Sequence, residues 1–190
     1  MRPVPHAWSR RPVAWLAAGA AAGTASVAIL IAVSSLAPNM PDWMFPSTPG
    51  LVFGIVLGGL LHLSGPRPAW RIACYVVSST VAHHLAHDLA VRLSKPDLTW
   101  ADGILAGALG SALLAAASML LFPPLDWRWH APSIVFLGSL GGSLLIPAVG
   151  LLDSNPWRLL ILYVPWQAAV AWASARLFLA QHPPRAAAVG

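Results

Sequence analysis

Six long apolar stretches, separated by short polar segments, dominate the pattern of hydrophobic and polar positions along the chain. Each is almost continuously apolar for roughly 17 to 25 residues, the length over which an α-helix crosses about 30 Å of hydrocarbon. The stretches are residues 13–37, 48–64, 69–93, 101–122, 131–152 and 157–180. The pattern predicts an all-α fold, a polytopic membrane protein with a six-transmembrane-helix bundle in a single domain, 1–190.

The segments between these stretches are short and rich in Pro, Gly and Asp, which are residues that end regular structure. None of them is long enough to hold a soluble domain. Within the stretches, three pairs of glycines stand four residues apart, a spacing that lets helix backbones approach closely in lipid. We expect these glycines to lie where helices pack together. The pairs are Gly19 and Gly23, Gly103 and Gly107, and Gly138 and Gly142.

Composition agrees with lipid as the surrounding medium. Hydrophobic residues make up 57% of the chain and charged residues 9%, whereas a soluble domain carries roughly 25% charged residues. The net charge of +5 is not gathered into a basic run with interleaved aromatic residues, so we expect a lipid bilayer and not a nucleic acid as the partner. The single cysteine, Cys74, excludes an intramolecular disulfide and a CxxC metal site.

The basic residues predict the orientation of the chain. Cytoplasmic loops of membrane proteins carry an excess of Lys and Arg, and alternate sides of the predicted bundle carry eight and three of them. The larger set is Arg2, Arg10, Arg11, Arg67, Arg71, Arg128, Arg176 and Arg185; the smaller set is Arg92, Lys95 and Arg158. We therefore expect both termini in the cytoplasm. High Arg and Ala contents with one Lys are typical of GC-rich bacteria, which favours a bacterial inner membrane.

One predicted helix, 69–93, carries a cluster of polar side chains. Residues four apart stack on one helix face, so His83 and His87 form one stripe, and His84 and Asp88 form the adjacent one. His83 follows the cytoplasmic Arg71 by twelve residues, or about 18 Å along a helix axis, which puts the cluster in the outer half of the membrane. Ionisable groups inside a span are costly, so the cluster is a candidate functional site.

Three interpretations of this cluster stay open. In the first, it lines a pocket or pathway for a small solute or proton, with Tyr163 and Gln167 completing the ligand site. In the second, His83, His87 and Asp88 bind a transition metal, since two histidines four apart on a helix can chelate one ion. In the third, the histidines only form hydrogen bonds with neighbouring helices, and Asp88 pairs with Arg92. Ser139, Ser143, Pro147 and Pro165 are further candidate lining residues.

The favoured function is an inner-membrane protein that binds or conducts a small solute, proton or metal ion through this site. One alternative is a non-catalytic structural or accessory subunit of a larger membrane complex, and a membrane-protein partner or a homo-oligomer fits either function. Another is a redox enzyme with haem b or a hydrolytic enzyme. We favour a non-enzymatic role and predict no catalytic residue, because the chain has no GxSxG, HExxH or Gly-rich phosphate loop. The cofactor is unknown; haem b is disfavoured because His62 and His83 fall at different depths.

Overall fold

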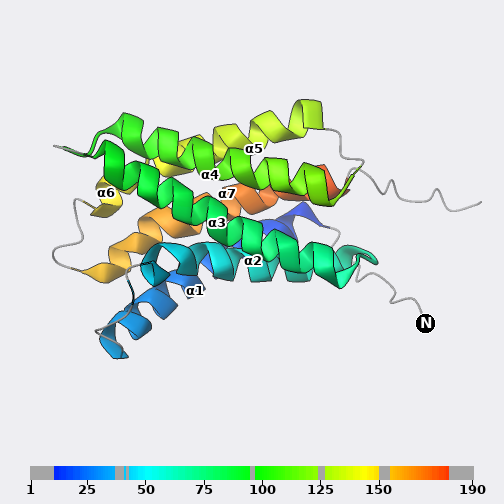
Figure 1. Cartoon of the computed structure of the whole chain (residues 1–190), viewed down its shortest axis with the longest axis horizontal. Coiled ribbons are helices and arrows are strands. Elements are labelled where there is room, and N and C mark those ends of the chain that lie inside the picture. The colour runs from blue at the N-terminus through cyan, green and yellow to red at the C-terminus, as the bar shows by residue number, and fades with distance from the viewer. Residues whose placement is uncertain are drawn as a thin grey trace, which may run out of the picture.

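The computed structural model describes residues 11–36, 41, 43–94, 97–123, 127–149 and 155–179, and every regular element in this part of the chain is helical (Figure 1). Six helices have 16 or more residues, and two short ones lie between α5 and α7. The elements are α1 (Pro12–Leu36), α2 (Met44–Ser64), α3 (Ala69–Leu93), α4 (Trp100–Leu121), α5 (Trp127–Gly142), α6 (Leu145–Val149), the 3₁₀ helix η2 (Pro156–Arg158) and α7 (Leu159–Leu179).

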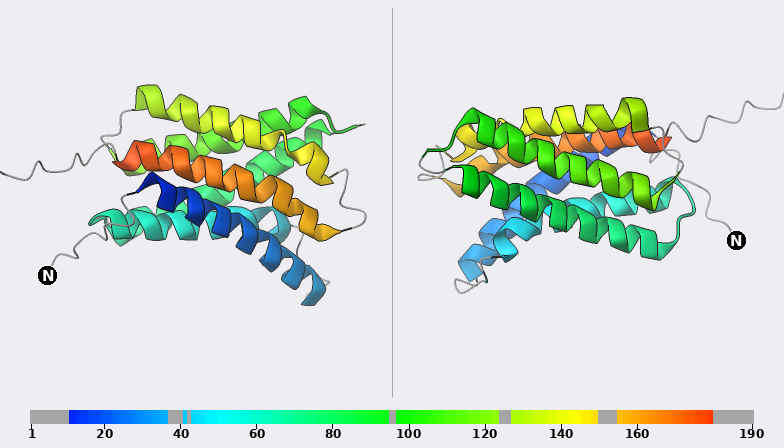
Figure 2. Two further views of the ribbon diagram at one scale, coloured as in Figure 1. Left: turned by 180° about the vertical axis from the view of Figure 1, so that it is seen from behind. Right: turned by 45° about the horizontal axis from the view of Figure 1, so that its top comes forward.

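The long helices run alternately in opposite directions and form a closed ring (Figures 1 and 2). Each long helix packs on the long helices before and after it in the chain, and α7 closes the ring by packing on α1. The first helix begins and the last ends at the same end of the bundle (Figure 2). We call this the inner end and the opposite end the outer end. The helix α3 is one member of the ring, so one face of it lies against α2 and α4 and another faces outward.

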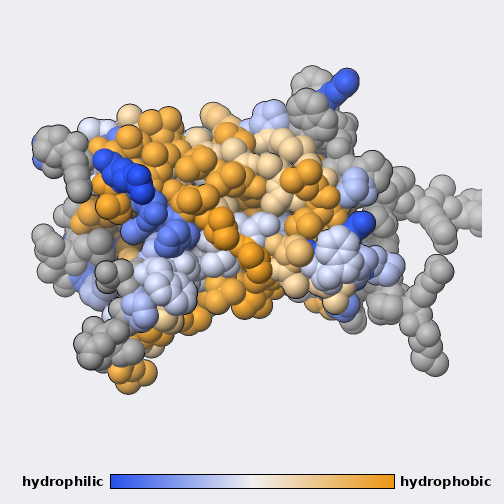
Figure 3. Space-filling view, in the orientation of Figure 1, coloured by the Kyte–Doolittle hydropathy of each residue, from blue (hydrophilic) through white to orange (hydrophobic). Residues whose placement is uncertain are grey.

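Four of the helical stretches are long and apolar enough to cross a membrane: Pro12–Leu36, Met44–Ser64, Trp100–Leu121 and His130–Val149. For the described residues, the prediction of an all-helical fold is therefore confirmed, and four helical stretches have the length and apolar composition that a membrane span requires. Helices α3 and α7 match these in length but carry more polar side chains, including the histidine cluster and Gln167. Hydrophobic side chains cover most of the middle of one face of the bundle, and hydrophilic ones gather toward its ends (Figure 3).

Helices α2 and α5 differ most from their predicted ranges: α5 begins at Trp127, four residues before 131, and the ends of α1, α3, α4 and α7 agree within two residues. Helix α2 begins at Met44, not at residue 48, and contains Pro46 and Pro49. Pro46 lies in the first turn, where the N–H groups have no helical partner, whereas Pro49 lies inside the helix and removes one helical hydrogen bond. The predicted span 131–152 agrees with the stretch His130–Val149, which is long and apolar enough to cross a membrane, but regular helix is interrupted within it, since α5 ends at Gly142 and α6 starts at Leu145. Pro147 cannot donate a backbone N–H to the preceding turn, which explains why regular helix stops there. Residues 37, 150–152 and 180 lie outside the described part.

The paired glycines do lie at helix contacts. A Cβ added at Gly23 would lie 2.6 Å from the carbonyl oxygen of Tyr163, so α1 and α7 touch through their backbones. Gly103 and Gly107 of α4 meet Gly142 and Gly138 of α5 in the same way. Such contacts gain van der Waals attraction that larger side chains would prevent. The packing prediction for these pairs is confirmed.

Large side chains fill the inner half of the ring. Trp15 and Phe178 stack with ring centroids 5.8 Å apart, and Phe122 meets Phe178 edge-on at 5.5 Å. Tyr75 contacts Phe122 at 5.9 Å and is fully buried. Aromatic pairs at these separations are attractive beyond the area that they bury. The inner half is therefore a conventional packed core that joins α1, α3, α4 and α7.

Candidate functional site: a cavity in the outer half of the ring

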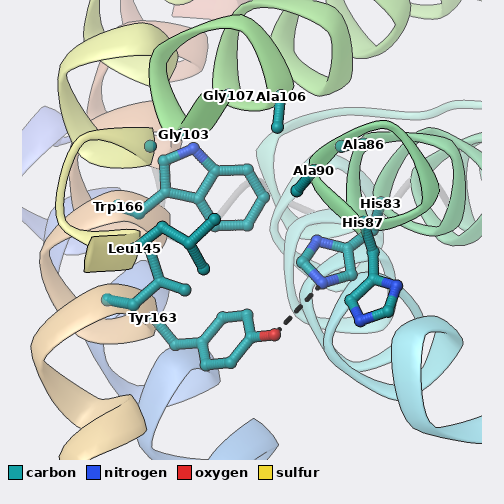
Figure 4. Close-up of a pocket in the computed structure, with 12 residues that line it drawn as sticks. His83, Ala86, His87, Ala90, Gly103, Ala106, Gly107, Leu145, Tyr163 and Trp166 are labelled. Carbon is teal, nitrogen blue, oxygen red and sulfur yellow. Dashed lines mark hydrogen bonds between the residues drawn. The ribbon is translucent and has the colours of Figure 1, made fainter. Parts of the chain in front are cut away.

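A cavity of about 70 Å³ lies inside the ring in its outer half (Figure 4). One wall is made of small residues from α3, α4 and α5, and the other carries larger side chains from α3, α6 and α7. The small residues are Ala86, Ala90, Gly103, Ala106, Gly107 and Gly142. The larger ones are His83, His87, Leu145, Leu162, Tyr163 and Trp166. A space of this size holds a few water molecules or one small chemical group.

His83 enters the cavity because α2 and α3 cross closely beside it. A Cβ at Gly50 of α2 would lie 2.6 Å from the His83 Cβ, and the Ser79 hydroxyl donates a 2.8 Å hydrogen bond to the Gly50 carbonyl. The contact leaves the His83 side chain buried and directed toward α7. There its Nε2 lies 3.4 Å from the Tyr163 hydroxyl, and the two rings tilt against each other with centroids 5.6 Å apart (Figure 4).

Trp166 also lines the cavity, and its ring contacts that of His83. Its ring centroid lies 5.3 Å from that of His83 and 6.4 Å from that of Phe53, which stacks against it. The indole Nε1 is buried and has no hydrogen-bond partner among the described residues, and the same holds for Nδ1 of His83 and Nδ1 of His87. An indole N–H can only donate, whereas an imidazole nitrogen donates or accepts according to its tautomer.

A second, smaller cavity of about 20 Å³ continues inward from the first, and His83 and Trp166 line both. Gln167 lies in it, fully buried. Its amide Nε2 donates to the Ser26 hydroxyl and to the Pro49 carbonyl at 3.4 Å, while its Oε1 has no partner within the described ranges. Polar atoms that need a partner therefore reach deep into the ring.

A wider space of about 400 Å³ lies on the outer side, which we call the vestibule. It shares His87, Leu145, Leu162 and Tyr163 with the central cavity, so the two are adjacent. Its remaining lining comes from the ends of α1, α2, α6 and α7: Leu30, Ile31, Ser34, Ser35, Phe45, Val149, Pro156 and Leu159. The three spaces together taper from the outer end of the ring toward its middle.

The predicted site residues separate into two groups. His83, His87, Tyr163 and Gln167 come together around these cavities, although they belong to two helices far apart in the sequence. His84 instead turns toward α2, where its Nδ1 lies 3.2 Å from the Ser47 hydroxyl. Asp88 lies half-exposed on the outside of α3 and lines none of the three cavities.

Asp88 forms its ion pairs with histidines on its own helix. Its carboxylate oxygens lie 3.8 Å from His84 Nε2 and 4.0 Å from His87 Nδ1, and within the described part no ion pair joins it to Arg92. These distances are longer than hydrogen bonds. No group of three or more His, Cys, Asp or Glu side chains in the described ranges is arranged to hold a metal ion. His62 and His130 lie near the inner ends of α2 and α5, away from His83.

The other candidate lining residues contribute little. The hydroxyl of Ser139 donates to the backbone carbonyl of Val135, and that of Ser143 donates to that of Leu140. Neither serine lines the three cavities, and neither Pro147 nor Pro165 does. Pro147 acts only through the helix break that exposes Leu145 to the cavity.

Sequence reasoning missed the small residues of the cavity wall. The glycine spacing predicts only a packing role for Gly103, Gly107 and Gly142, and these residues do bring α4 and α5 together. Because they have no side chains, they also leave the central space unfilled. The signal was present as an excess of Ala and Gly in the outer parts of 69–93 and 101–122. It could not be read as a cavity until the facing helices were known.

Comparison with known proteins does not identify the chain, since no protein-family model, no curated protein and no solved structure matches it.

Proposed function

We propose that this chain is a bacterial inner-membrane protein with six spans and both ends in the cytoplasm, and that it binds a small uncharged solute in the cavity of its outer half. The observation that carries the proposal is the set of unpartnered polar atoms around that cavity. Trp166 and His83 line the central space and Gln167 lines the space behind it, and each has a buried polar atom without a partner among the described residues: Nε1 of Trp166, Nδ1 of His83 and Oε1 of Gln167. The solute would supply their hydrogen bonds.

The energetic argument concerns the cost of leaving such atoms unpaired. A buried donor or acceptor without a partner costs about 1–3 kcal/mol, so a protein that buries several of them is less stable than it need be. Apolar side chains of similar shape would remove the cost in a purely structural bundle. Retaining polar atoms beside an unfilled space is expected where a bound molecule completes them.

The walls indicate which kind of molecule fits. The central cavity is lined by no Asp, Glu, Lys or Arg, so a charged ligand would be buried without an opposite charge, which is costly. Its one obligatory donor, the Trp166 N–H, calls for a hydrogen-bond acceptor such as a carbonyl oxygen. The apolar remainder of the walls and the adjoining vestibule suit an apolar body. We therefore assign the solute to the class of small, neutral, largely apolar molecules that carry an acceptor.

The membrane placement is supported by the ring itself. Six antiparallel long helices return the chain to the end where it began, and four of the stretches are apolar enough to span. Of the residues in the charge count, Arg11, Arg67, Arg71, Arg128 and Arg176 lie toward the inner end, and Arg92 and Arg158 lie toward the outer end. Arg2, Arg10, Lys95 and Arg185 lie outside the described residues. The excess at the inner end favours a cytoplasmic position for it.

Three probes of similar shape test the proposed chemistry in purified protein. Acetophenone carries an acceptor, ethylbenzene lacks one, and benzoate is charged. We expect acetophenone to bind about threefold to tenfold more tightly than ethylbenzene, the value of one hydrogen bond, and benzoate to bind most weakly. Binding is measured as the ligand-dependent rise of the unfolding temperature of the protein in nanodiscs.

Trp166→Phe provides the decisive variant, because it removes the N–H and keeps most of the ring. It should abolish the preference of acetophenone over ethylbenzene while both still bind. Trp172→Phe, on the same helix and outside all three cavities, is the matched control and should keep the preference. Equal binding of all three probes by the wild-type protein would contradict the proposal, and would favour a structural role for the histidine cluster.

A further inference from the structure

The inner end of the bundle carries two arginines whose surroundings differ from those of a solvated surface charge. Arg67 lies in the connection between α2 and α3, and Arg71 lies in the first turn of α3. In both side chains the Nε atom is buried and has no hydrogen-bond partner among the described residues. Each guanidinium offers a planar array of N–H donors that matches the oxygens of a phosphate group.

Aromatic rings fix the position of both guanidinium groups. The Arg67 Cζ lies 5.0 Å from the centroid of Phe122 and 5.4 Å from that of Phe178, at the inner ends of α4 and α7. The Arg71 Cζ lies 5.3 Å from the ring centroid of Trp70. A guanidinium over an aromatic face is attracted by the ring and loses part of its freedom to move. The two groups are therefore held in place before any ligand arrives.

The charge of this pair is not balanced by the described residues. The chain has six Asp and no Glu, and the described carboxylates, Asp88, Asp97 and Asp102, all lie toward the outer end. Burial, and secondarily the neighbouring Arg71 charge, lower the pKa of the Arg67 guanidinium. An anion between the two arginines would relieve both effects. Asp126, in the segment between α4 and α5, lies outside the described residues.

We propose that Arg67 and Arg71 form a binding site for a phosphate group at the inner end of the bundle. The start of α3 contributes to it, because the first N–H groups of a helix point toward a ligand at that end and favour negative charge. The exposed Trp70 ring beside the pair belongs at the boundary between headgroups and hydrocarbon. This makes the headgroup of an anionic phospholipid the first source of the phosphate, and a soluble phosphate ester the second. The site is separate from the outer cavity.

Native mass spectrometry of protein released from mixed micelles of phosphatidylcholine and phosphatidylglycerol tests the proposal. The wild-type protein should retain phosphatidylglycerol in preference to phosphatidylcholine. Arg67→Gln and Arg71→Gln should each lower that preference about tenfold, the loss expected when one charge-assisted hydrogen bond to the phosphate is removed. Arg176→Gln is the control, because this exposed arginine lies near the same end, with its Cζ 3.9 Å from the Trp172 ring centroid, and should leave the preference unchanged.

Two further arms separate the sources of the anion. Loss of bound phosphatidylglycerol on addition of sn-glycerol 3-phosphate would assign the site to soluble phosphate esters, whereas no competition supports the lipid. The Asp126→Asn variant tests a protein counter-ion, and should leave the lipid preference of the wild-type unchanged. The proposal is overturned if wild-type protein shows no preference for phosphatidylglycerol, a result that needs no folded variant, or if Arg176→Gln loses as much of it as Arg67→Gln. Neither result bears on the outer cavity.

Discussion

The inner and outer halves of the ring are packed in opposite ways. In the inner half, large side chains such as Trp15, Tyr75 and Phe178 fill the space between the helices. In the outer half, glycines and alanines let the helix backbones touch on one side and leave a hollow on the other. The same six helices pass through both halves, so the difference comes from side-chain size at facing positions and not from the backbone path.

This difference shows what makes a membrane bundle a binding protein and not only a scaffold. Because lipid tails are as apolar as the helix surfaces, packing two apolar helices together gains no hydrophobic free energy, so the stability of the bundle depends on close packing. An unfilled space forfeits some of that packing. The outer half forfeits it where polar atoms of His83 and Trp166 lack partners. A smaller buried apolar cluster also lies in the outer half: Val27, Leu30, Ala148, Leu159, Leu162 and Tyr163. We expect the inner half to contribute more to stability and the outer half to carry the binding capacity, and the two expectations can be tested separately.

The largest expected effect comes from the same substitution, Leu to Ala, made at two positions of α7, one in each half of the ring. Leu177 lies in the inner core with 1% of its surface exposed, whereas Leu162 lines the outer cavities with 8% exposed. Leu177→Ala should lower the free energy of unfolding by about 4 kcal/mol and Leu162→Ala by about 2 kcal/mol, because a side chain beside a void has fewer contacts to lose. Unfolding in detergent by denaturant titration measures both. Equal losses would contradict the contrast between the halves.

The second effect concerns the glycine contact between α4 and α5. A Cβ at Gly107 would collide with the backbone carbonyl of Gly138, which cannot move aside as a side chain can. Gly107→Ala should therefore cost about 3 kcal/mol, the upper end for overpacking. Gly59, in α2, has nothing within 4 Å of such a Cβ, and Gly59→Ala should stabilise the helix by about 0.5–1 kcal/mol. The same denaturant titration measures both variants. An unchanged free energy of unfolding in Gly107→Ala would show that α4 and α5 are not in backbone contact.

The third effect tests whether the hollow is wet and the outer surface of the ring is in lipid. In a Cys74→Ser background, Ala86→Cys introduces a thiol into the cavity wall, and Leu85→Cys introduces one on the exposed face of α3 at the same depth. A membrane-impermeant thiol reagent should label Ala86→Cys about tenfold faster, because only a hydrated thiol ionises to the reactive thiolate. In a protein surrounded by water the order would reverse, since Leu85 is the more exposed position.

The sequence predicted the spans well because their signal is local. Apolar length fixes a membrane helix, and the range 69–93 agrees with α3 at both ends. The interruption after Gly142 was missed because Pro147, to which we attribute it, lies five residues beyond Gly142 in a stretch that is otherwise apolar. Helical spacing likewise placed His83 and His87 on one stripe, and both line the cavity.

The assignment of the remaining polar residues needed the neighbouring helices. In the stripe of His84 and Asp88, His84 turns toward α2 and Asp88 lies half-exposed on the outside of α3. Nothing in the spacing distinguishes this stripe from that of His83. Gln167 and Tyr163 were named only as polar residues at suitable depth. Their roles depend on the close contact of α1 with α7 at Gly19 and Gly23, and on that of α2 with α3 at Gly50. No local pattern in the sequence shows which helices will lie in contact with one another.

The smallest expected effect concerns the contact between His83 and Tyr163, and it asks whether the outer half is held by polar contacts at all. The hydroxyl lies 3.4 Å from Nε2, a long hydrogen bond, so Tyr163→Phe should lower the free energy of unfolding by only about 0.5–1 kcal/mol. His83→Ala should cost more, because it also removes ring contacts with Trp166.

The double variant then isolates the hydrogen bond between His83 and Tyr163. If Tyr163→Phe lowers the free energy of unfolding as much in the His83→Ala background as in wild-type protein, the two side chains are not coupled. A coupling of about 0.5 kcal/mol would instead show that α3 and α7 are joined across the cavity. The hydrogen bond would then help to keep the space between them open.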